Sequence, residues 1–184
     1  MRLFVAIDLP WSVRERLADM AGSGIPGARW LPEENYHLTL RFIGEVPGFL
    51  AEEIDHALAA LKVRSFSLTL AGLGTFSKAG RGSALWVGVE RNQQLEHLRG
   101  KVETALQRCG LEPERRRFQP HVTLARLDNA VESKVAAFMQ AHNLFRADPV
   151  PVQHFTLFSS LLGKEQAIYT AEVEYPLVQA SAQA

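Results

Sequence analysis

Two short patterns in the sequence combine a histidine with a threonine two residues later. The first is His37-Leu38-Thr39-Leu40, and the second is His121-Val122-Thr123-Leu124. Because alternate side chains of a β-strand share one face, each pattern places an imidazole and a hydroxyl on one side of a strand and two apolar groups on the other. Two such strands facing each other would offer one imidazole as general acid and one as general base, each beside a hydroxyl donor. This combination suits acid–base chemistry on a phosphate ester.

Other chemistries fit these residues less well. One copy alone would be explained by a histidine at a strand end and a β-branched threonine that favours a sheet, but two matching copies favour a functional site. Neither pattern contains an aspartate, glutamate or cysteine, and two imidazoles rarely complete a metal site. The sequence also lacks the Gly-x-Ser-x-Gly motif of a serine nucleophile, the phosphate-binding Walker loop and the Gly-x-Gly-x-x-Gly dinucleotide fingerprint. We therefore expect no metal and no cofactor.

The composition is that of a globular, cytoplasmic protein. The 184 residues are 47% hydrophobic and 22% charged, which fits one large domain or two small lobes packed together. Twenty basic and twenty acidic residues give a formal net charge of zero, so no overall field attracts nucleic acid or anionic lipid. The lone Cys109 excludes an intramolecular disulfide and fits a reducing compartment. The apolar run at the amino terminus is too short for a signal peptide, and no later run approaches a membrane span.

The elements around the two patterns follow the same order twice. Each half of the sequence predicts a strand, a helix, the histidine–threonine strand, a second helix and a final strand. The expected strands cover residues 3–7, 37–43 and 66–70 in the first half and 85–89, 121–127 and 152–157 in the second. The expected helices carry apolar stripes over residues 13–20, 50–61, 95–106 and 131–139. An internal duplication explains this order, and it would place the two patterns on symmetry-related strands that face one cleft.

Helix starts and loops are predicted from local signals. Residues 12–15 read as a capping box for the first helix, and Asn129 and Glu132 can cap the fourth. The glycine-rich segment 72–82 reads as a loop between the halves, either a mobile one that closes over a ligand or, as we favour, a solvated hairpin connection. Residues 179–184 lack an apolar stripe and are expected to fray.

With these flanking residues the chain resembles the 2H phosphoesterase superfamily, and within it the bacterial and archaeal RNA 2′,3′-cyclic phosphodiesterases, formerly called 2′-5′ RNA ligases. The likeness rests on segments 3–10, 37–46, 118–126 and 155–157, which span nearly the whole chain. The resemblance implies an α+β fold of two pseudo-symmetric lobes, each an antiparallel sheet with helices on its outer face, around a central cleft. It further implies one domain over residues 1–184, built of two intertwined lobes with approximate repeat units 1–76 and 83–160.

Carried over residue by residue, the resemblance makes His37 and His121 the acid and base. It makes Thr39 and Thr123 the donors of hydrogen bonds to phosphate. By analogy with the superfamily, His121 is the base and His37 the acid, an assignment that the residues alone do not decide.

Five residues after each histidine stand Phe42 and Arg126, which match a base-stacking aromatic and a phosphate-binding arginine in relatives. Strict alternation counted from His121 places Arg126 on the opposite face, so Arg126 reaches the cleft only if the strand twists or bulges. Other candidates for contact with RNA are the aromatic residues Tyr36 and Phe118 and the arginine triplet 115–117, although the triplet equally fits a solvated loop.

The resemblance implies metal-independent hydrolysis of a 2′,3′-cyclic phosphate at the end of RNA or an oligonucleotide to a 2′-phosphate. The enzyme is expected to be a monomer with no membrane partner. Three alternatives stay open. The same chemistry could join RNA through a 2′-5′ linkage, the substrate could be a small cyclic nucleotide or an ADP-ribose derivative, or the chain could be a noncatalytic module that binds RNA ends. The presence of both intact patterns disfavours the last.

Overall fold

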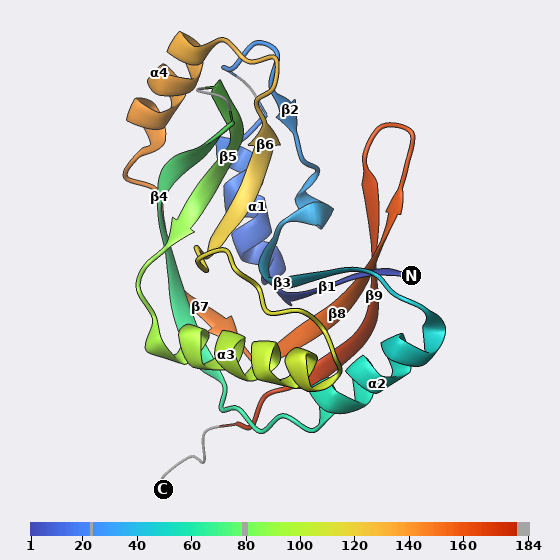
Figure 1. Ribbon diagram of the computed structural model, residues 1–184. Coiled ribbons are helices and arrows are strands. Elements are labelled where there is room, and N and C mark those ends of the chain that lie inside the picture. The colour runs from blue at the N-terminus through green and yellow to red at the C-terminus, as the bar shows by residue number, and fades with distance from the viewer. Residues whose placement is uncertain (23, 79–80, 180–184) are drawn as a thin grey trace, which may run out of the picture.

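The computed structural model describes residues 1–22, 24–78 and 81–179 (Figure 1). An antiparallel sheet and four α-helices form this part of the chain, as the predicted α+β class requires. In order, the elements are β1 (Arg2–Asp8), α1 (Trp11–Met20), β2 (Arg29–Trp30), the 3-10 helix η1 (Glu33–Asn35), β3 (His37–Glu45), α2 (Gly48–Ala59), β4 (Phe66–Lys78), β5 (Arg81–Val89), α3 (Gln93–Arg108), β6 (His121–Arg126), α4 (Glu132–His142), β7 (Arg146–Val152), β8 (His154–Leu162) and β9 (Ala167–Pro176).

The strands follow the order β7-β4-β5-β6-β3-β1-β8-β9, and β2 pairs with β6. All of these strand pairs are antiparallel. In the middle of the sheet, β3 and β6 pair through Leu38 and Val122, which we call the central pair. Four strands of the main order therefore lie on each side of the central pair.

Two strands pair with strands from the other half of the sequence. Strand β4 ends the first predicted repeat, yet it pairs with β5 and β7. Strand β8 ends the second, yet it pairs with β1 and β9, with Leu3 opposite Ser159. Strands β7 and β9 were not predicted. Each side of the sheet is thus completed by a strand from the other half of the sequence.

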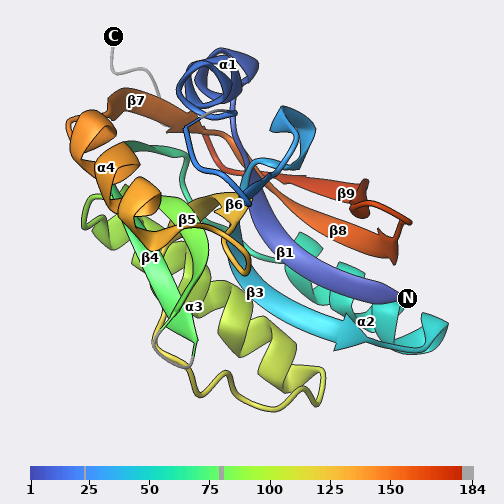
Figure 2. The same cartoon turned by 90° about the horizontal axis from the view of Figure 1, so that it is seen from above.

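Alternation along the strands sorts side chains onto two faces. On β1, Leu3, Val5 and Ile7 lie in the main hydrophobic core, whereas Phe4 and Ala6 belong to a separate small cluster. Helices α1, α2 and α3 bury their apolar stripes in the same main core as the central pair. A fully buried apolar side chain of this kind contributes roughly 1.5–3 kcal/mol. Figure 2 shows β1 and β3 running side by side across the middle of the molecule. These three helices therefore cover one face of the central strands, and the opposite face of β1 carries the cluster of Phe4, Ala6 and Phe158.

The predicted helix caps are wrong at both helices that they concern. Helix α1 begins directly after Pro10 and has no side-chain cap, so the capping box predicted at residues 12–15 does not start it. At this N-cap position the missing N–H of proline costs no helical hydrogen bond, because the first N–H groups of a helix have no partner within it. Helix α4 begins after Val131, again with no hydrogen bond from a capping side chain, so neither Asn129 nor Glu132 acts as predicted.

The segment between the halves is a β-hairpin. Strand β4 continues to Lys78 and β5 begins at Arg81, so the hairpin alternative is right and a mobile loop over a ligand is wrong for the described residues. Gly74 lies against the ring of Trp86, and a Cβ at this position would approach the ring to 2.2 Å. A larger residue therefore cannot replace Gly74 without displacing Trp86. Gly80 lies outside the described residues.

The structure describes only the first residue of the tail that was expected to fray, residues 179–184. Residues 180–184, most of the segment expected to fray, lie outside the described residues. Within the described part of the chain, no helix has the length and apolarity needed to cross a membrane.

Candidate active site

The two histidine–threonine strands meet at the centre of the sheet. The central pair is fully buried, and extending its antiparallel register by one residue in each direction sets His37 opposite Thr123 and Thr39 opposite His121. These four side chains alternate with the buried residues of their strands and are partly exposed. The structure thus brings the four predicted catalytic residues to one face of the sheet.

The two imidazoles are diagonal neighbours in this register. Side chains at diagonal positions of an antiparallel pair lie about 7–8 Å apart. His37 is close enough to His121 for a charge on the second ring to lower the pKa of the first. With hydrogen bonds of about 2.7–3.0 Å on either side, this spacing accommodates one tetrahedral phosphate between the rings.

Both histidine rings are held by the same backbone contact. Nδ1 of His37 lies 2.7 Å from the carbonyl oxygen of Asn35, and Nδ1 of His121 lies 2.6 Å from the carbonyl oxygen of Gln119. A carbonyl oxygen can only accept a hydrogen bond, so Nδ1 carries the hydrogen in both rings. The neutral form of each ring therefore keeps its lone pair on Nε2, and Nε2 is the nitrogen that can exchange a proton with a substrate.

Aromatic rings enclose His37. Phe4 on β1 and Phe158 on β8 lie 5.0 and 6.2 Å from the imidazole, and the edge of Tyr169 on β9 lies at 5.3 Å, all measured between ring centroids. Burial among these rings lowers the pKa of His37 to about 4, although the Asn35 carbonyl and a nearby carboxylate partly oppose this change. His37 is therefore neutral at pH 7 in the free protein.

A second aromatic pair packs against His121. The centroids of Phe76 on β4 and Trp86 on β5 lie 4.7 and 5.9 Å from that of the imidazole. Burial lowers the pKa of His121, the hydrogen bond to Gln119 opposes the change, and the charge of Arg126 adds to it. Each histidine thus rests on one aromatic residue from the strand that opens its half and one from the strand that crosses over.

Sequence reasoning missed these aromatic residues, although the sequence contains a signal for two of them. The strand that opens each half contains an aromatic residue between leucine and valine, as Leu3-Phe4-Val5 and as Leu85-Trp86-Val87. Aligning the two repeats would have marked Phe4 and Trp86 as equivalent positions. No comparable local pattern identifies Tyr169, which reaches His37 from the last strand.

A one-residue bulge lies at the fourth residue of each motif. The partners of β3 on β1 skip Leu40, and the partners of β6 on β5 skip Leu124. A bulge shifts the alternation by one residue, so positions at an odd distance from the histidine come to the histidine's face. Phe42 and Arg126 both lie beyond the bulge. Strict alternation, which placed Arg126 on the opposite face, is wrong here because the strand bulges.

The predicted substrate-binding side chains lie close to the histidines. Phe42 is 60% exposed, and its ring centroid lies 5.9 Å from that of Phe4. Arg126 is exposed, and its charge acts on His121. Tyr36, in contrast, is only 2% exposed, so the prediction that it stacks on a base is wrong.

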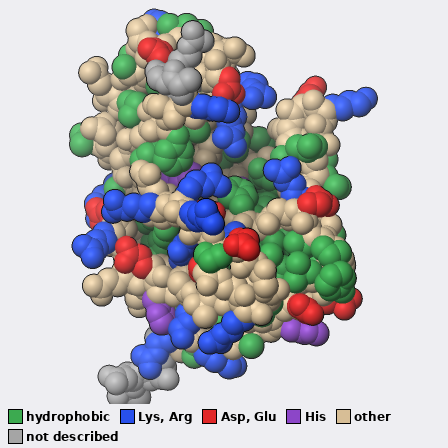
Figure 3. Space-filling view, in the orientation of Figure 1, with side chains coloured by type: hydrophobic (Ala, Val, Ile, Leu, Met, Phe, Trp, Pro, Cys, Tyr) green, Lys and Arg blue, Asp and Glu red, His purple; other side chains and the backbone are tan. Residues whose placement is uncertain are grey.

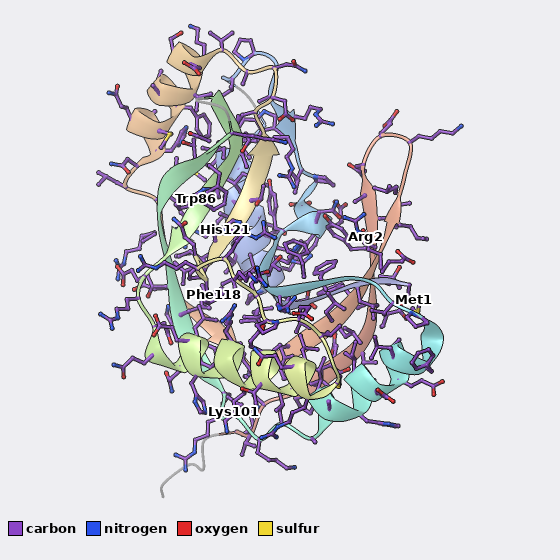
Figure 4. The ribbon with its side chains drawn as sticks, viewed as in Figure 1. Met1, Arg2, Trp86, Lys101, Phe118 and His121 are labelled. Atoms are coloured by element: carbon purple, nitrogen blue, oxygen red, sulfur yellow. The ribbon has the colours of Figure 1, made fainter. Side chains whose placement is uncertain are left out.

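A pocket of about 320 Å³ opens beside Thr39 and His121. Aromatic rings from β3, β4 and the segment before β6 line it together with four arginines, namely Arg41, Arg99, Arg116 and Arg117. Figure 3 shows Lys and Arg side chains gathered across the middle of this face beside a histidine. In Figure 4, Trp86, His121 and Phe118 follow one another toward α3. Two members of the predicted arginine triplet thus line a pocket that reaches a catalytic candidate.

A buried ion pair fixes the wall of this pocket. Nε of Arg41 lies 2.7 Å from Oε2 of Glu103, with the two side chains 9% and 10% exposed. Arg41 also donates to the carbonyl oxygens of Phe42 and Glu112, and Glu103 accepts a 2.9 Å hydrogen bond from the backbone N–H of Glu114. Burial opposes ionisation of Glu103, but these hydrogen bonds outweigh it and hold its pKa at about 2. The pair thereby ties β3, α3 and the segment that leads into β6 together.

Comparison with known proteins agrees with this architecture. The sequence model of the 2′-5′ RNA ligase superfamily matches residues 12–164. The RNA 2′,3′-cyclic phosphodiesterase of Aeropyrum pernix is 36% identical over 157 residues, which cover 84% of this chain and 89% of that protein. The protein of the same name from Thermotoga maritima is 33% identical over 175 residues, which cover 92% and 91%.

Solved structures extend the likeness to the fold. The crystal structure of Escherichia coli LigT complexed with 3′-AMP superposes with a TM-score of 0.76 at 27% identity, covering 97% of this chain and 98% of that one. The family model covers most of the chain, and the resemblance inferred from the two motifs is confirmed. The chain belongs to the 2′-5′ RNA ligase superfamily.

Proposed function

We propose that the chain hydrolyses 2′,3′-cyclic phosphates at the 3′ ends of RNA or oligonucleotides, giving a 2′-phosphate and a free 3′-hydroxyl. The observation that carries the proposal is the matched pair of histidines, each held through Nδ1 by a carbonyl two residues upstream, on two strands that pair at Leu38 and Val122. The names of the relatives, RNA 2′,3′-cyclic phosphodiesterases, support the substrate class. The proposed reaction needs no metal, and the protein acts as a monomer.

In the proposed reaction, one neutral imidazole takes a proton from water through Nε2 while the water oxygen attacks phosphorus in line with O3′. The opposite imidazolium gives its proton to O3′ as the P–O3′ bond breaks. The P–O2′ bond remains intact, so the product is a 2′-phosphate. The hydroxyls of Thr39 and Thr123 and the guanidinium of Arg126 stabilise the nonbridging oxygens as negative charge accumulates. Phe42 stacks on the terminal base.

The two histidines must hold opposite protonation states when the reaction begins. The resemblance assigns the base to His121 and the acid to His37, yet a pKa of about 4 leaves His37 neutral at pH 7 in the free protein. A phosphate anion bound between the rings would raise both pKa values, because a nearby negative charge favours the protonated form. We infer that the acid takes up its proton together with the substrate.

We also infer that residues 1–76 and 83–160 are two copies of one repeat, which form two intertwined lobes of a single domain around a central cleft. Three repeated features support this inference. Each motif strand bulges at its fourth residue, each histidine packs against two aromatic rings, and one strand of each half pairs on the other side of the sheet. The packing of α1, α2 and α3 on the face opposite the histidines supports helices on the outer face of each lobe.

The test is incubation of the purified protein with an oligonucleotide that ends in a 2′,3′-cyclic phosphate, in the presence of EDTA. Phosphorus NMR of the product then distinguishes a 2′-phosphate from a 3′-phosphate. We expect a 2′-phosphate from the wild-type protein and a rate of formation lowered by at least roughly 10²-fold in the double variant His37→Ala/His121→Ala. A 3′-phosphate would contradict the proposed direction of attack, and loss of activity that a divalent ion restores would contradict the metal-free reaction.

Ligation is the second candidate, and the family match favours it. A 5′-hydroxyl of another RNA would replace water as the nucleophile, and the product would be a 2′-5′ phosphodiester. Adding an oligonucleotide with a free 5′-hydroxyl to the same assay tests this reading, because ligation lengthens the product. Retention of the cyclic end with tight binding and no turnover would instead support a noncatalytic binding module.

A further inference from the structure

The pocket beside His121 is lined by an excess of positive charge, although the chain as a whole has none. The chain has a formal net charge of zero, yet four arginines and one glutamate line this pocket. Arg41 forms an ion pair with Glu103, and Nε of Arg116 lies 3.6 Å from Oε1 of Glu114. Within the described residues, Arg99 has neither an ion pair nor a hydrogen bond. The pocket therefore contains a guanidinium that is available for an anion.

Arg99 is prepared for such an anion by its packing. It lies on α3, and the carbon at the centre of its guanidinium is 5.3 Å from the centroid of the Phe118 ring. Its Nε is buried and has no hydrogen-bond partner among the described residues. Because Nε is buried, an anion can reach Arg99 only through the two terminal nitrogens, and a planar guanidinium held over an aromatic ring suits bidentate contact of these nitrogens with phosphate.

The position of Arg99 relates this anion site to the reacting phosphate. Thr39 and His121 lie in the same pocket as Arg99 and Phe118, and Phe42 lines it as well. A nucleotide whose cyclic phosphate lies between the histidines can therefore place a second phosphate of the same strand in this pocket. The terminal nucleotide has only one such neighbour, the phosphodiester on its 5′ side.

Building on the proposed function, we propose that this pocket is a second phosphate subsite, which binds the phosphodiester on the 5′ side of the terminal nucleotide through Arg99. The subsite makes the enzyme select strand ends over free cyclic mononucleotides. It also explains how a chain with no net charge can bind RNA, because the contact is confined to one phosphate beyond the reacting one.

The experiment compares two substrates that differ by one phosphate, adenosine 2′,3′-cyclic phosphate and the same nucleotide with a 5′-phosphate. For the wild-type protein we expect kcat/KM to be at least tenfold higher with the 5′-phosphate present. Arg99→Met should bring this ratio close to one, and Arg99→Lys should retain part of it because the charge remains. Arg108→Met is the matched control, since Arg108 is exposed on the same helix outside this pocket, and it should keep the wild-type ratio. Melting temperatures establish that each variant is folded.

A binding measurement separates the subsite from catalysis. Isothermal titration calorimetry with adenosine 2′,5′-bisphosphate and adenosine 2′-phosphate should give the same preference without turnover, again lost in Arg99→Met. Equal kcat/KM and equal affinity for the paired ligands in the wild-type protein would overturn the subsite. A preference that survives in Arg99→Met would overturn the role of Arg99. Absence of hydrolysis together with a preserved difference in affinity would refute the proposed function and leave the subsite standing.

Discussion

The ion pair between Arg41 and Glu103 predicts how much stability the protein loses when Glu103 is neutralised, and how that loss depends on pH. Replacing Glu103 by glutamine keeps the shape of the side chain and removes its charge, leaving the buried Arg41 without its counterion. The pKa of Glu103 falls from an ordinary value of 4.5 to about 2 in the folded protein. At about 1.36 kcal/mol for each pKa unit, the charged carboxylate contributes about 3 kcal/mol to the free energy of unfolding at pH 7.

The sign of the pH dependence follows from the direction of this pKa change. A carboxyl whose pKa is lower in the folded state contributes its full stability above its unfolded pKa, here near 4.5, and loses it as the pH falls toward 2. At pH 3 the difference between wild type and Glu103→Gln should therefore shrink to about 1.4 kcal/mol. The titration of His37 affects both proteins equally and cancels in the difference.

Thermal unfolding followed by calorimetry at pH 7 and pH 3 measures these values. A loss of about 3 kcal/mol corresponds to a melting temperature lowered by roughly 6–12 °C for a chain of this size. The control is Glu90→Gln, which breaks the exposed 2.6 Å pair with Arg146 and should change stability by less than about 1 kcal/mol. A Glu103→Gln protein that melts within 2 °C of wild type at pH 7, or a difference that does not shrink at pH 3, would refute the reasoning.

Three other predictions concern the site. His37→Ala and His121→Ala should each lower turnover by roughly 10²–10⁴ while the protein still folds, with the double variant little worse. A folded variant with wild-type turnover would remove its histidine from the mechanism. Because burial lowers the pKa of both rings, the acidic limb of kcat/KM should lie below 6.5 whichever ring is the base, since this limb follows the lower pKa of the pair. A limb at or above 6.5 in a pH–rate profile would contradict this. Gly74→Ala should lower the free energy of unfolding by about 1–3 kcal/mol, since its Cβ would meet Trp86 at 2.2 Å. Gly100→Ala on α3 has nothing within 4 Å of its Cβ and should raise the free energy of unfolding by up to about 1 kcal/mol. Equal melting temperatures of the two variants would count against the packing argument.

Patterns within short segments of the sequence predicted the motif strands and the four α-helices. The alternation in each motif placed its histidine and threonine on one face, because a strand has a period of two whatever it pairs with. The apolar stripes predicted all four α-helices for the same kind of reason. The helix starts failed because proline at α1 and an uncapped start at α4 replaced the expected side-chain caps.

The remaining features depend on contacts between segments that are distant in the sequence. The bulges at Leu40 and Leu124 exist only relative to the partner strands, so no property of either leucine predicts them. Arg41 and Glu103 look like ordinary surface charges until β3 and α3 are packed together. One aromatic residue beside each histidine could have been predicted from the sequence, since Phe4 and Trp86 occupy equivalent positions when the two halves are aligned.

The crossing of β8 to the first strand has a consequence for biosynthesis. Strand β1 is synthesised before β3 and long before β8, and its edge on the side of β8 is paired only when residues 156–159 follow. Until then, Phe4 lacks Phe158, and the wall that buries His37 is incomplete. Pairing between such distant segments folds slowly, and an unpaired apolar strand edge is exposed to aggregation in the meantime. A nascent chain that already contains both motifs therefore lacks part of the wall around His37, and one edge of β1 stays open, until β8 has been made.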